Sequence, residues 1–162
     1  MKKCIKRIAL YFAVICAGNL ISQTVDCKSL FLKVDTSTKY GYWAQKTSRY
    51  TGDCVQYYSN GKKEGEFHYE NGHLSGIAKW YFTNGQLKME CTYIFDSHFG
   101  PMASGPIAEY FENGKIKRKV NYKDGVQDGK WFENDSNGKI LKSGEYKNGK
   151  LVSGDSYSPP LK

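Results

Sequence analysis

The sequence lacks the motifs by which most enzymes and metal sites are recognised. Its 162 residues contain three histidines, His68, His73 and His98, and none lies at metal-ligand spacing from another ligand residue. No His-Glu-x-x-His, Gly-x-Ser-x-Gly, Cys-x-x-Cys or glycine-rich phosphate loop is present. Without a nucleophile, a base and an oxyanion donor that can be assembled by motif, the sequence predicts no enzyme activity, no cofactor and no bound metal.

Sustained helical periodicity is also absent. Beyond the N-terminus, no window places apolar residues at i, i+3, i+4 and i+7 for three turns. Aromatic residues make up 15% of the chain, and there are 13 tyrosines, 17 glycines and only 4 prolines. Such a composition, with a mean hydropathy of -0.62, favours strands joined by many turns. We therefore expect an almost entirely β fold.

No apolar run reaches the roughly 20 residues that a membrane-spanning helix needs. Lys2, Lys3, Lys6 and Arg7 precede a shorter apolar stretch from Ile8 to Ile21. This pattern is typical of an export signal. We predict a signal peptide over residues 1–22 that forms a helix, with cleavage after Ser22 or, alternatively, near Gly18. An uncleaved anchor, an N-terminal strand and lipid attachment at Cys16 remain alternatives, although Ile15 fits a lipoprotein processing site poorly. We predict an exported protein, either periplasmic, outer-membrane associated or secreted.

A clustered basic stripe is missing as well. The formal charge of +8 falls to +4 when residues 1–22 are removed, because 20 basic and 16 acidic residues remain. The remaining lysines alternate with acidic and amide residues, which is typical of a solvated sheet face. Without a basic stripe or a recognition motif, nucleic-acid binding is not predicted.

Cysteine is scarce in the predicted mature chain, where Cys27, Cys54 and Cys91 form an odd set. Export permits a disulfide and would leave one thiol over. Cys54 and Cys91 should lie three strands apart, about 14 Å, which exceeds the roughly 7 Å that a bridge allows. A Cys27–Cys54 bridge is possible, and three separate buried thiols are the simpler alternative.

The chain does contain a fourfold repeat, with units that begin at Gly52, Gly76, Gly105 and Gly129. An Asn-Gly pair ends nine residues later in every unit, and a tyrosine follows eight residues after that. An Asn-Gly or Asp-Gly pair comes next in units one, three and four. Four coincidences at fixed offsets establish a repeat. The structural repeat positions are Gly61, Tyr69, Gly85, Tyr93, Gly114, Tyr122, Gly138 and Tyr146.

Each Asn-Gly or Asp-Gly pair predicts a tight hairpin, since both residues tolerate the positive φ of a type I′ turn. The result is an antiparallel meander. Residues two apart share a face, so Leu87, Cys91 and Tyr93 should lie together, as should their counterparts Ile116, Val120 and Tyr122. The opposite face receives Lys117, Lys119 and Asn121. The four repeat tyrosines should form a structural ladder along one face.

The repeat resembles the MORN-repeat variant family of bacterial proteins, which includes members labelled as YwqK-family antitoxins. The pattern is Gly, four residues, two aromatics, one residue and Asn-Gly, followed by Tyr-x-Asn/Asp-Gly. The residues that carry it best are Gly105, Tyr110, Phe111, Asn113, Gly114, Tyr122, Asp124, Gly125 and Gly129. The resemblance covers residues 50–154 and implies an elongated, twisted antiparallel sheet of hairpins that acts in recognition or scaffolding without catalysis.

Three segments depart from the repeat. Residues 23–49 form an arm with possible strands at Ser29–Val34 and Tyr40–Ala44, and we expect it to cap the first edge of the sheet. Unit two carries an insertion, Phe95–Ser104, which we expect to be a surface loop and a possible partner-binding element. Unit four has early aromatics and a longer polar turn at residues 134–137. Residues 155–162 form a C-terminal tail whose prolines should end the sheet.

We predict a binding scaffold for a protein or envelope partner, and exposed aromatic residues are its candidate contacts. An antitoxin or immunity role is one alternative. Binding to anionic membranes through Lys-rich turns, Lys62-Lys63 and Lys115–Lys119, is another. The candidate partner-binding residues are Trp80, Tyr81, Phe82, Phe95, His98, Phe99, Tyr110 and Phe111.

Overall fold

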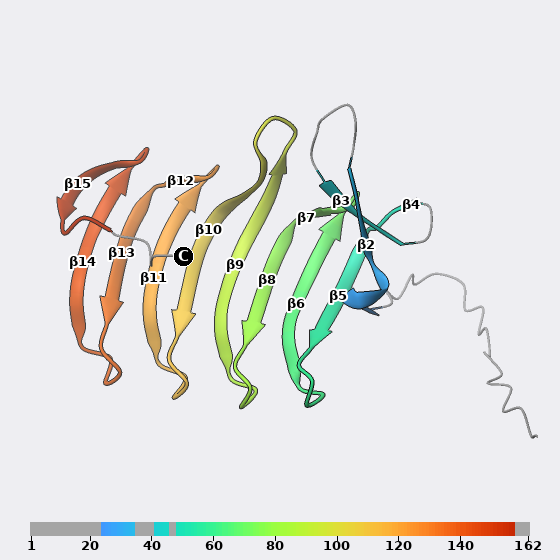
Figure 1. The fold of residues 1–162 in the computed structure, drawn as a ribbon. Coiled ribbons are helices and arrows are strands. Elements are labelled where there is room, and N and C mark those ends of the chain that lie inside the picture. Colours follow the sequence, from blue (N-terminus) through green and yellow to red (C-terminus); the bar gives the residue numbers. More distant parts are fainter. Residues whose placement is uncertain (1–23, 35–40, 46–47, 158–162) are drawn as a thin grey trace, which may run out of the picture.

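A computed structural model describes residues 24–34, 41–45 and 48–157. The predicted signal peptide and its helix at residues 1–22 lie outside these residues, as do the tail residues 158–162. The described residues form one 12-stranded sheet and one 3-stranded sheet. Figure 1 shows the large sheet as a row of hairpins, and the predicted all-β meander is confirmed.

The large sheet follows the chain almost strand by strand, in the order β1-β5-β6-β8-β9-β10-β11-β13-β14-β15. Its first half comprises β1 (Val25–Asp26), β5 (Gly52–Tyr57), β6 (Lys63–Glu70), β7 (His73–Leu74), β8 (Gly76–Tyr81) and β9 (Leu87–Asp96). Its second half comprises β10 (Gly100–Tyr110), β11 (Ile116–Lys123), β12 (Val126–Gln127), β13 (Gly129–Asn134), β14 (Ile140–Lys147) and β15 (Lys150–Gly154). The short strands β7 and β12 pair beside β6 and β11.

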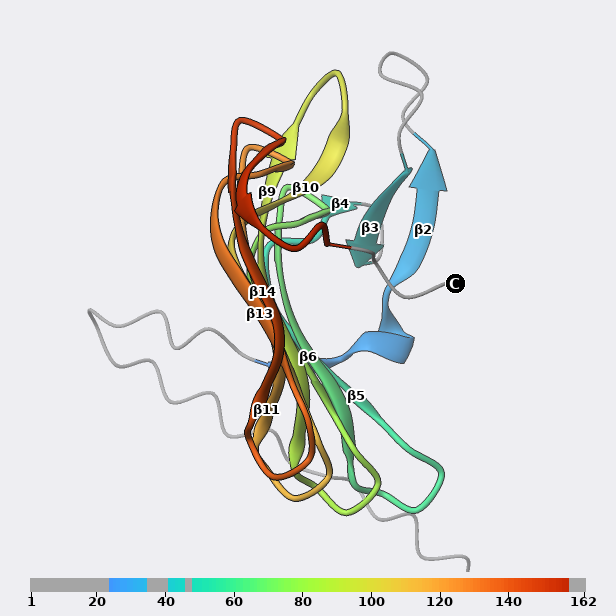
Figure 2. The ribbon, with the colours of Figure 1, turned by 90° about the vertical axis from the view of Figure 1, so that its left-hand side faces the viewer.

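The N-terminal arm divides between the two sheets. Strand β1 runs parallel to β5 at the end of the large sheet, with Val25 opposite Cys54. A 3-10 turn, η1 (Cys27–Ser29), follows. The small sheet consists of β2 (Phe31–Val34), β3 (Gly41–Gln45) and β4 (Ser48–Arg49). Figure 2 shows that it stands off one face of the large sheet. We call this face, which is turned toward the viewer in Figure 1, the front face, and its opposite the back face.

The repeat uses two kinds of turn, whereas the sequence predicted one. Asn71-Gly72, Asp124-Gly125 and Asn148-Gly149 have positive φ at both residues, as a type I′ turn requires. In the other set, Gly61, Gly85, Gly114 and Gly138 have positive φ but the preceding asparagines do not. Backbone bonds such as Gly114 N–H to Phe111 O (2.9 Å) instead define three-residue loops with a glycine bulge.

In the third loop the asparagine side chain serves two turns. Asn113 Oδ1 accepts the N–H of Lys115 at 3.0 Å within its own loop. Asn113 Nδ2 donates to Ser136 O at 2.9 Å in the next loop. The loops are thereby stacked one on another along the lower edge in Figure 1. The fourth loop has the same length as the others, because Asp135 bonds to Lys139 and Gly138 as Phe111 bonds to Lys115 and Gly114. The prediction of a longer turn there was wrong.

Register shifts beside these loops correct the predicted faces. In each hairpin the pairing slips by one residue next to the loop, for example between Glu109 and Tyr110. Ile116 therefore pairs with Tyr110, and Leu87 pairs with Tyr81. Since directly opposed residues share a face, Leu87 and Ile116 lie on the back and not with the repeat tyrosines.

The predicted surface loop at Phe95–Ser104 is an extension of a β-hairpin. Strands β9 and β10 continue through it, with Phe95 opposite Pro101 and Asp96 opposite Gly100. The hairpin projects beyond the other turns in Figure 1. A register irregularity between Ala103 and Ile107 joins the extension to the next unit.

Candidate functional site

The front face carries the tyrosine ladder, and each tyrosine lies opposite a glycine. Tyr69, Tyr93, Tyr122 and Tyr146 stand on β6, β9, β11 and β14, so one strand lies between each tyrosine and the next. Their cross-strand partners are Gly52, Gly76, Gly105 and Gly129 respectively. These glycines all have positive φ, a backbone conformation that other residues rarely adopt, which is the reason that glycine recurs there. The two most regular positions of the repeat thus form one contact.

The next row of the front face supplies much of the buried core, although Phe67 and Ile107 within it are half-exposed. From β5 to β14 it contains Cys54, Phe67, Ala78, Cys91, Ile107, Val120, Trp131 and Gly144. In unit four, Trp131 stands where unit two has Ala78, and Gly144 stands opposite it where unit two has Cys91. A large residue is therefore balanced by a small one across the strands. A Cβ on Gly144 would lie 2.7 Å from Trp131 Nε1, so the indole needs that glycine.

The N-terminal arm covers one end of the front face. The Cys27–Cys54 disulfide, with Cα atoms 5.0 Å apart, ties the arm to β5 and settles the pairing that the sequence left open. Leu30 and Tyr50 are buried against Cys54. Trp43 packs edge-on against Tyr69 with ring centroids 6.3 Å apart. A cavity of about 350 Å³ remains beneath the arm, lined by Cys27, Lys28, Leu30, Trp43, Gln56, Phe67 and Tyr69. Cys91 is a buried free thiol.

The C-terminal segment covers the other end. Tyr157 packs edge-on against Trp131, with ring centroids 5.3 Å apart. Arg118, which is 5% exposed, places its guanidinium 5.5 Å from the Tyr157 ring centre. Its charge is paired with Glu109 on β10, and Glu133 stands opposite it on β13. The apolar front face therefore contains one buried cation that is neutralised from the neighbouring strand.

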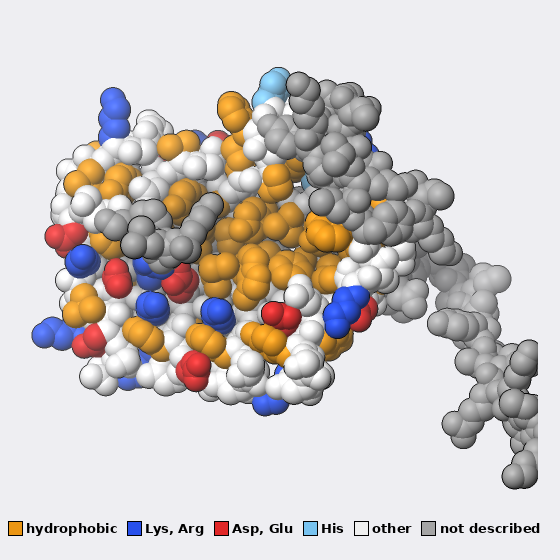
Figure 3. All heavy atoms as spheres, in the orientation of Figure 1, with side chains coloured by type: hydrophobic (Ala, Val, Ile, Leu, Met, Phe, Trp, Pro, Cys, Tyr) orange, Lys and Arg blue, Asp and Glu red, His pale blue; other side chains and the backbone are white. Residues whose placement is uncertain are grey.

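Between the two covered ends the front face is apolar and half-exposed. The side chains on β6 to β11 that line this stretch are Phe67, Trp80, Met89, Tyr93, Ile107 and Tyr122, and all are of intermediate exposure. We call these six residues the central patch. Figure 3 shows the hydrophobic surface that they belong to as a continuous area in the middle of the sheet. Burial raises the pKa of Tyr93 to about 12, with Cys91 adding to the shift.

The back face carries polar side chains that are paired with one another. His68 Nδ1 lies 2.6 Å from Asp53 Oδ1. Glu66 accepts hydrogen bonds from Lys63 at 2.5 Å and from the Tyr81 hydroxyl, and the two bonds lower the pKa of Glu66. Burial, followed by the bond to Glu66, raises the pKa of Tyr81 to about 12. The polar groups described on this face are thus paired with one another, and Ile77 is exposed beside them.

The predicted partner-binding residues do not form one surface. Trp80 lies on the front and packs against Phe67 with centroids 5.4 Å apart. The hydroxyls of Tyr81 and Tyr110 bond to Glu66 and Glu90 on the back. Phe82 and Phe111 follow β8 and β10 at the loops, where Lys88 and Lys117 lie 5.8 and 6.0 Å from their ring centres. Phe95 stacks on the buried His73, with centroids 3.6 Å apart.

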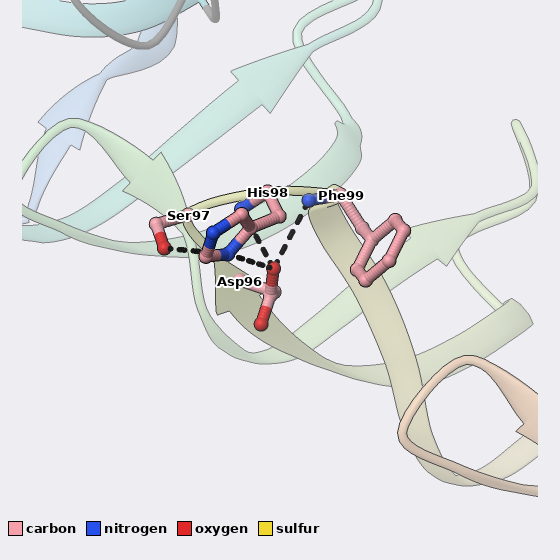
Figure 4. Close-up of polar contacts among 4 residues, drawn as sticks. All are labelled: Asp96, Ser97, His98 and Phe99. Carbon is pink, nitrogen blue, oxygen red and sulfur yellow. Dashed lines mark hydrogen bonds and ion pairs between the residues drawn. The ribbon is translucent and has the colours of Figure 1, made fainter.

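The remaining two candidates are at the tip of the long hairpin, shown in Figure 4. Asp96 Oδ1 accepts the backbone N–H groups of His98 (2.7 Å) and Phe99 (3.0 Å), and Ser97 Oγ lies 3.3 Å from His98 Nδ1. The Phe99 side chain points away from this network and is 76% exposed. The tip therefore presents a single apolar ring on a turn that its own aspartate holds closed.

The basic turn suggested for membrane binding is divided by the fold. Arg118 is buried on the front face, Lys115 Nζ donates to Asn137 O at 2.9 Å, and Lys117 lies over the Phe111 ring. Among the described residues, no cluster of three or more His, Cys, Asp or Glu could hold a metal ion. No helix in this part of the chain has the length and apolarity to cross a bilayer.

Sequence reasoning missed Arg118 and Tyr157 as parts of the front face. Arg118 stands two residues before Val120, so its position in the apolar alternation was a usable signal. Tyr157 lies outside the repeat, and no spacing pointed to its contact with Trp131.

Comparison with known families decides what this array is. The MORN repeat variant matches four times, at residues 50–71, 74–94, 105–124 and 127–152. The chain belongs to the MORN repeat variant family. Its four repeats are the four hairpin units of the large sheet, and the N-terminal arm and C-terminal tail lie outside them.

Comparison with curated proteins gives no match. Among solved structures, the MORN array is similar to a mutant of S. aureus TarM in complex with Fondaparinux, alpha-GlcNAc-glycerol and UDP. The TM-score is 0.36 and the identity 9%, over 79% of this chain and 22% of that chain. The chain thus spans about a fifth of that protein's length, and a likeness of this strength carries no argument.

Proposed function

We propose that this MORN protein is an exported, non-enzymatic scaffold that binds a protein partner on the central patch. The observation that carries the proposal is the position of this patch. Four of its six residues are aromatic and the other two are Met89 and Ile107, so the polar side-chain groups of the patch are two phenol hydroxyls and one indole N–H. Aromatic residues and methionine are enriched at protein interfaces, and soluble monomers seldom leave a large contiguous apolar area open.

The two ends of the front face favour binding in the middle. The disulfide-linked arm fills the N-terminal end through Leu30 and Trp43, and Tyr157 fills the C-terminal end. The front-face residues at both ends are thus covered by the chain itself, whereas Trp80 on β8, Met89 on β9 and Ile107 on β10 are half-exposed. A partner that contributes apolar side chains over these three strands would bury them in the same way.

Two features support export. Residues 1–22 have the charged and apolar regions of a signal peptide, and the Cys27–Cys54 disulfide fits an oxidising compartment. Mass spectrometry of the protein from the native cell envelope should find a mature chain that begins at Gln23. Recovery of the chain from the cytoplasm alone, with residues 1–22 intact, would contradict export.

The binding face is tested by placing one charge on either side of the same sheet. Met89 lies opposite Glu109, so Met89→Lys puts an ammonium group into the central patch beside a carboxylate and should leave the fold stable. Ile77, which is 56% exposed on the back face, provides the matched control Ile77→Lys. Wild-type chain and both variants would be used to capture proteins from an envelope extract.

We expect the wild type and Ile77→Lys to retain the same partner and Met89→Lys to lose it. Circular dichroism before capture establishes that both variants are folded. Retention of every partner by Met89→Lys, together with loss by Ile77→Lys, would move the binding surface to the back face and overturn the proposal.

A further inference from the structure

The chain turns back over its own front face after the last strand. Asp155 N–H donates to Ser143 O at 2.9 Å, and Ser143 N–H donates to Asp155 Oδ2 at 3.2 Å. Two residues later, Tyr157 N–H donates to the Tyr146 hydroxyl at 2.9 Å. Figure 2 shows that the chain after β15 leaves the sheet on the same side as the small sheet. The tail is therefore attached by backbone hydrogen bonds to β14 and to the tyrosine ladder.

Tyr157 then extends inward along the ladder. Its backbone is bonded to Tyr146 on β14, its ring packs on Trp131 of β13, and the same ring lies over Arg118 of β11. Trp131, Tyr146 and Val120 form the buried cluster on which Tyr157 and Tyr122 both pack. The direction of these contacts is from the outer edge of the sheet toward its middle.

We propose that the segment Asp155–Tyr157 is an intramolecular ligand of the front face, with Tyr157 as its anchor. It occupies the C-terminal end of the tyrosine ladder, where the Tyr157 ring covers Trp131 and Arg118. The inference rests on the proposed function only in that the tail and the partner share one face. Removing the anchor opens a site for a peptide of the same sequence.

The test supplies the tail in trans. A fluorescent peptide with the sequence of residues 154–162 would be titrated into the full chain and into its Tyr157→Ala and Tyr157→Phe variants, with anisotropy as the readout. The tethered tail has an effective concentration in the millimolar range, so we expect the peptide to bind Tyr157→Ala about tenfold or more tighter than wild type. Tyr157→Phe keeps the ring and the backbone N–H, so it should behave like the wild type.

A peptide with alanine in place of the tyrosine is the matched control and should bind none of the three chains. Circular dichroism and thermal unfolding establish that each variant is folded. Equal peptide affinity for wild type and folded Tyr157→Ala, or no binding to either, would overturn the proposal. Since the peptide assay needs no partner, failed capture by the central patch and failure of the tail hypothesis are separate results.

Discussion

The Cys27–Cys54 disulfide provides the sharpest stability prediction. Cys27→Ala removes the bond while Cys54, which is 1% exposed and part of the core, keeps its place. The bridge closes a loop with a sequence separation of 27. For a loop of this size the chain-entropy relation gives about 3.5 kcal/mol at 25 °C from restriction of the unfolded chain. With an m-value of about 2 kcal/mol/M, the urea midpoint should fall by about 1.8 M.

Urea unfolding followed by circular dichroism, with and without reductant, measures this change. Reductant should shift the wild type to the midpoint of Cys27→Ala and leave Cys27→Ala itself unaffected. The reasoning is refuted if oxidised wild type and Cys27→Ala unfold at the same urea concentration, because the arm would then gain nothing from its cross-link to β5.

Three further predictions concern the stability of the fold. Gly144→Ala would place a Cβ 2.5 Å from Asp155 O and 2.7 Å from Trp131 Nε1, so calorimetry should show a loss of about 1–3 kcal/mol, whereas Ser143→Ala should change stability by less than about 0.5 kcal/mol. Glu109→Ala leaves the buried Arg118 charge without its nearest partner and should cost about 2–3 kcal/mol of stability in urea unfolding. Arg118→Met removes that charge and should cost less. A larger loss for Arg118→Met than for Glu109→Ala would contradict the buried pair. Tyr81 and Tyr93 each have a pKa of about 12 against an ordinary 10.0, so the folded state holds their protons more tightly. Their stabilising effect is complete below pH 10 and is lost as pH rises from 10 to 12, so the urea midpoint should fall over this range. The midpoint should fall less steeply with pH in Tyr93→Phe. Equal slopes of midpoint against pH in the wild type and Tyr93→Phe would rule out Tyr93 as a contributor.

The sequence predicted the architecture because the repeat signals are local. An Asn-Gly or Asp-Gly pair reverses the chain with the residues of the pair alone, and the glycine–tyrosine spacing places the ladder. It could not predict that Asn113 adopts negative φ in a three-residue loop while Asp124 adopts positive φ in a two-residue one, since both pairs tolerate either geometry. The resulting bulges turned Leu87 and Ile116 to the back face.

The front face was less predictable because its ends are closed by distant residues. Tyr157 meets Trp131 across 26 positions, and Cys27 meets Cys54 across 27, neither within the repeat. Counting aromatics selected Tyr81 and Tyr110, whose hydroxyls bond to back-face carboxylates, beside Trp80 on the front. Composition shows that aromatic residues are present, whereas register decides which of them share a surface.

The central claim is that a partner binds the front face of the MORN array, and adjacent residues on β9 test it most directly. Tyr93 faces the front, opposite Gly76, and Thr92 faces the back, opposite Ile77. A photo-reactive phenylalanine analogue at position 93 or 92 of the full chain, irradiated in the native envelope, would be followed by identification of the cross-linked proteins. The account predicts one defined adduct from position 93 and none from position 92. An adduct from position 92 with none from position 93 would contradict it.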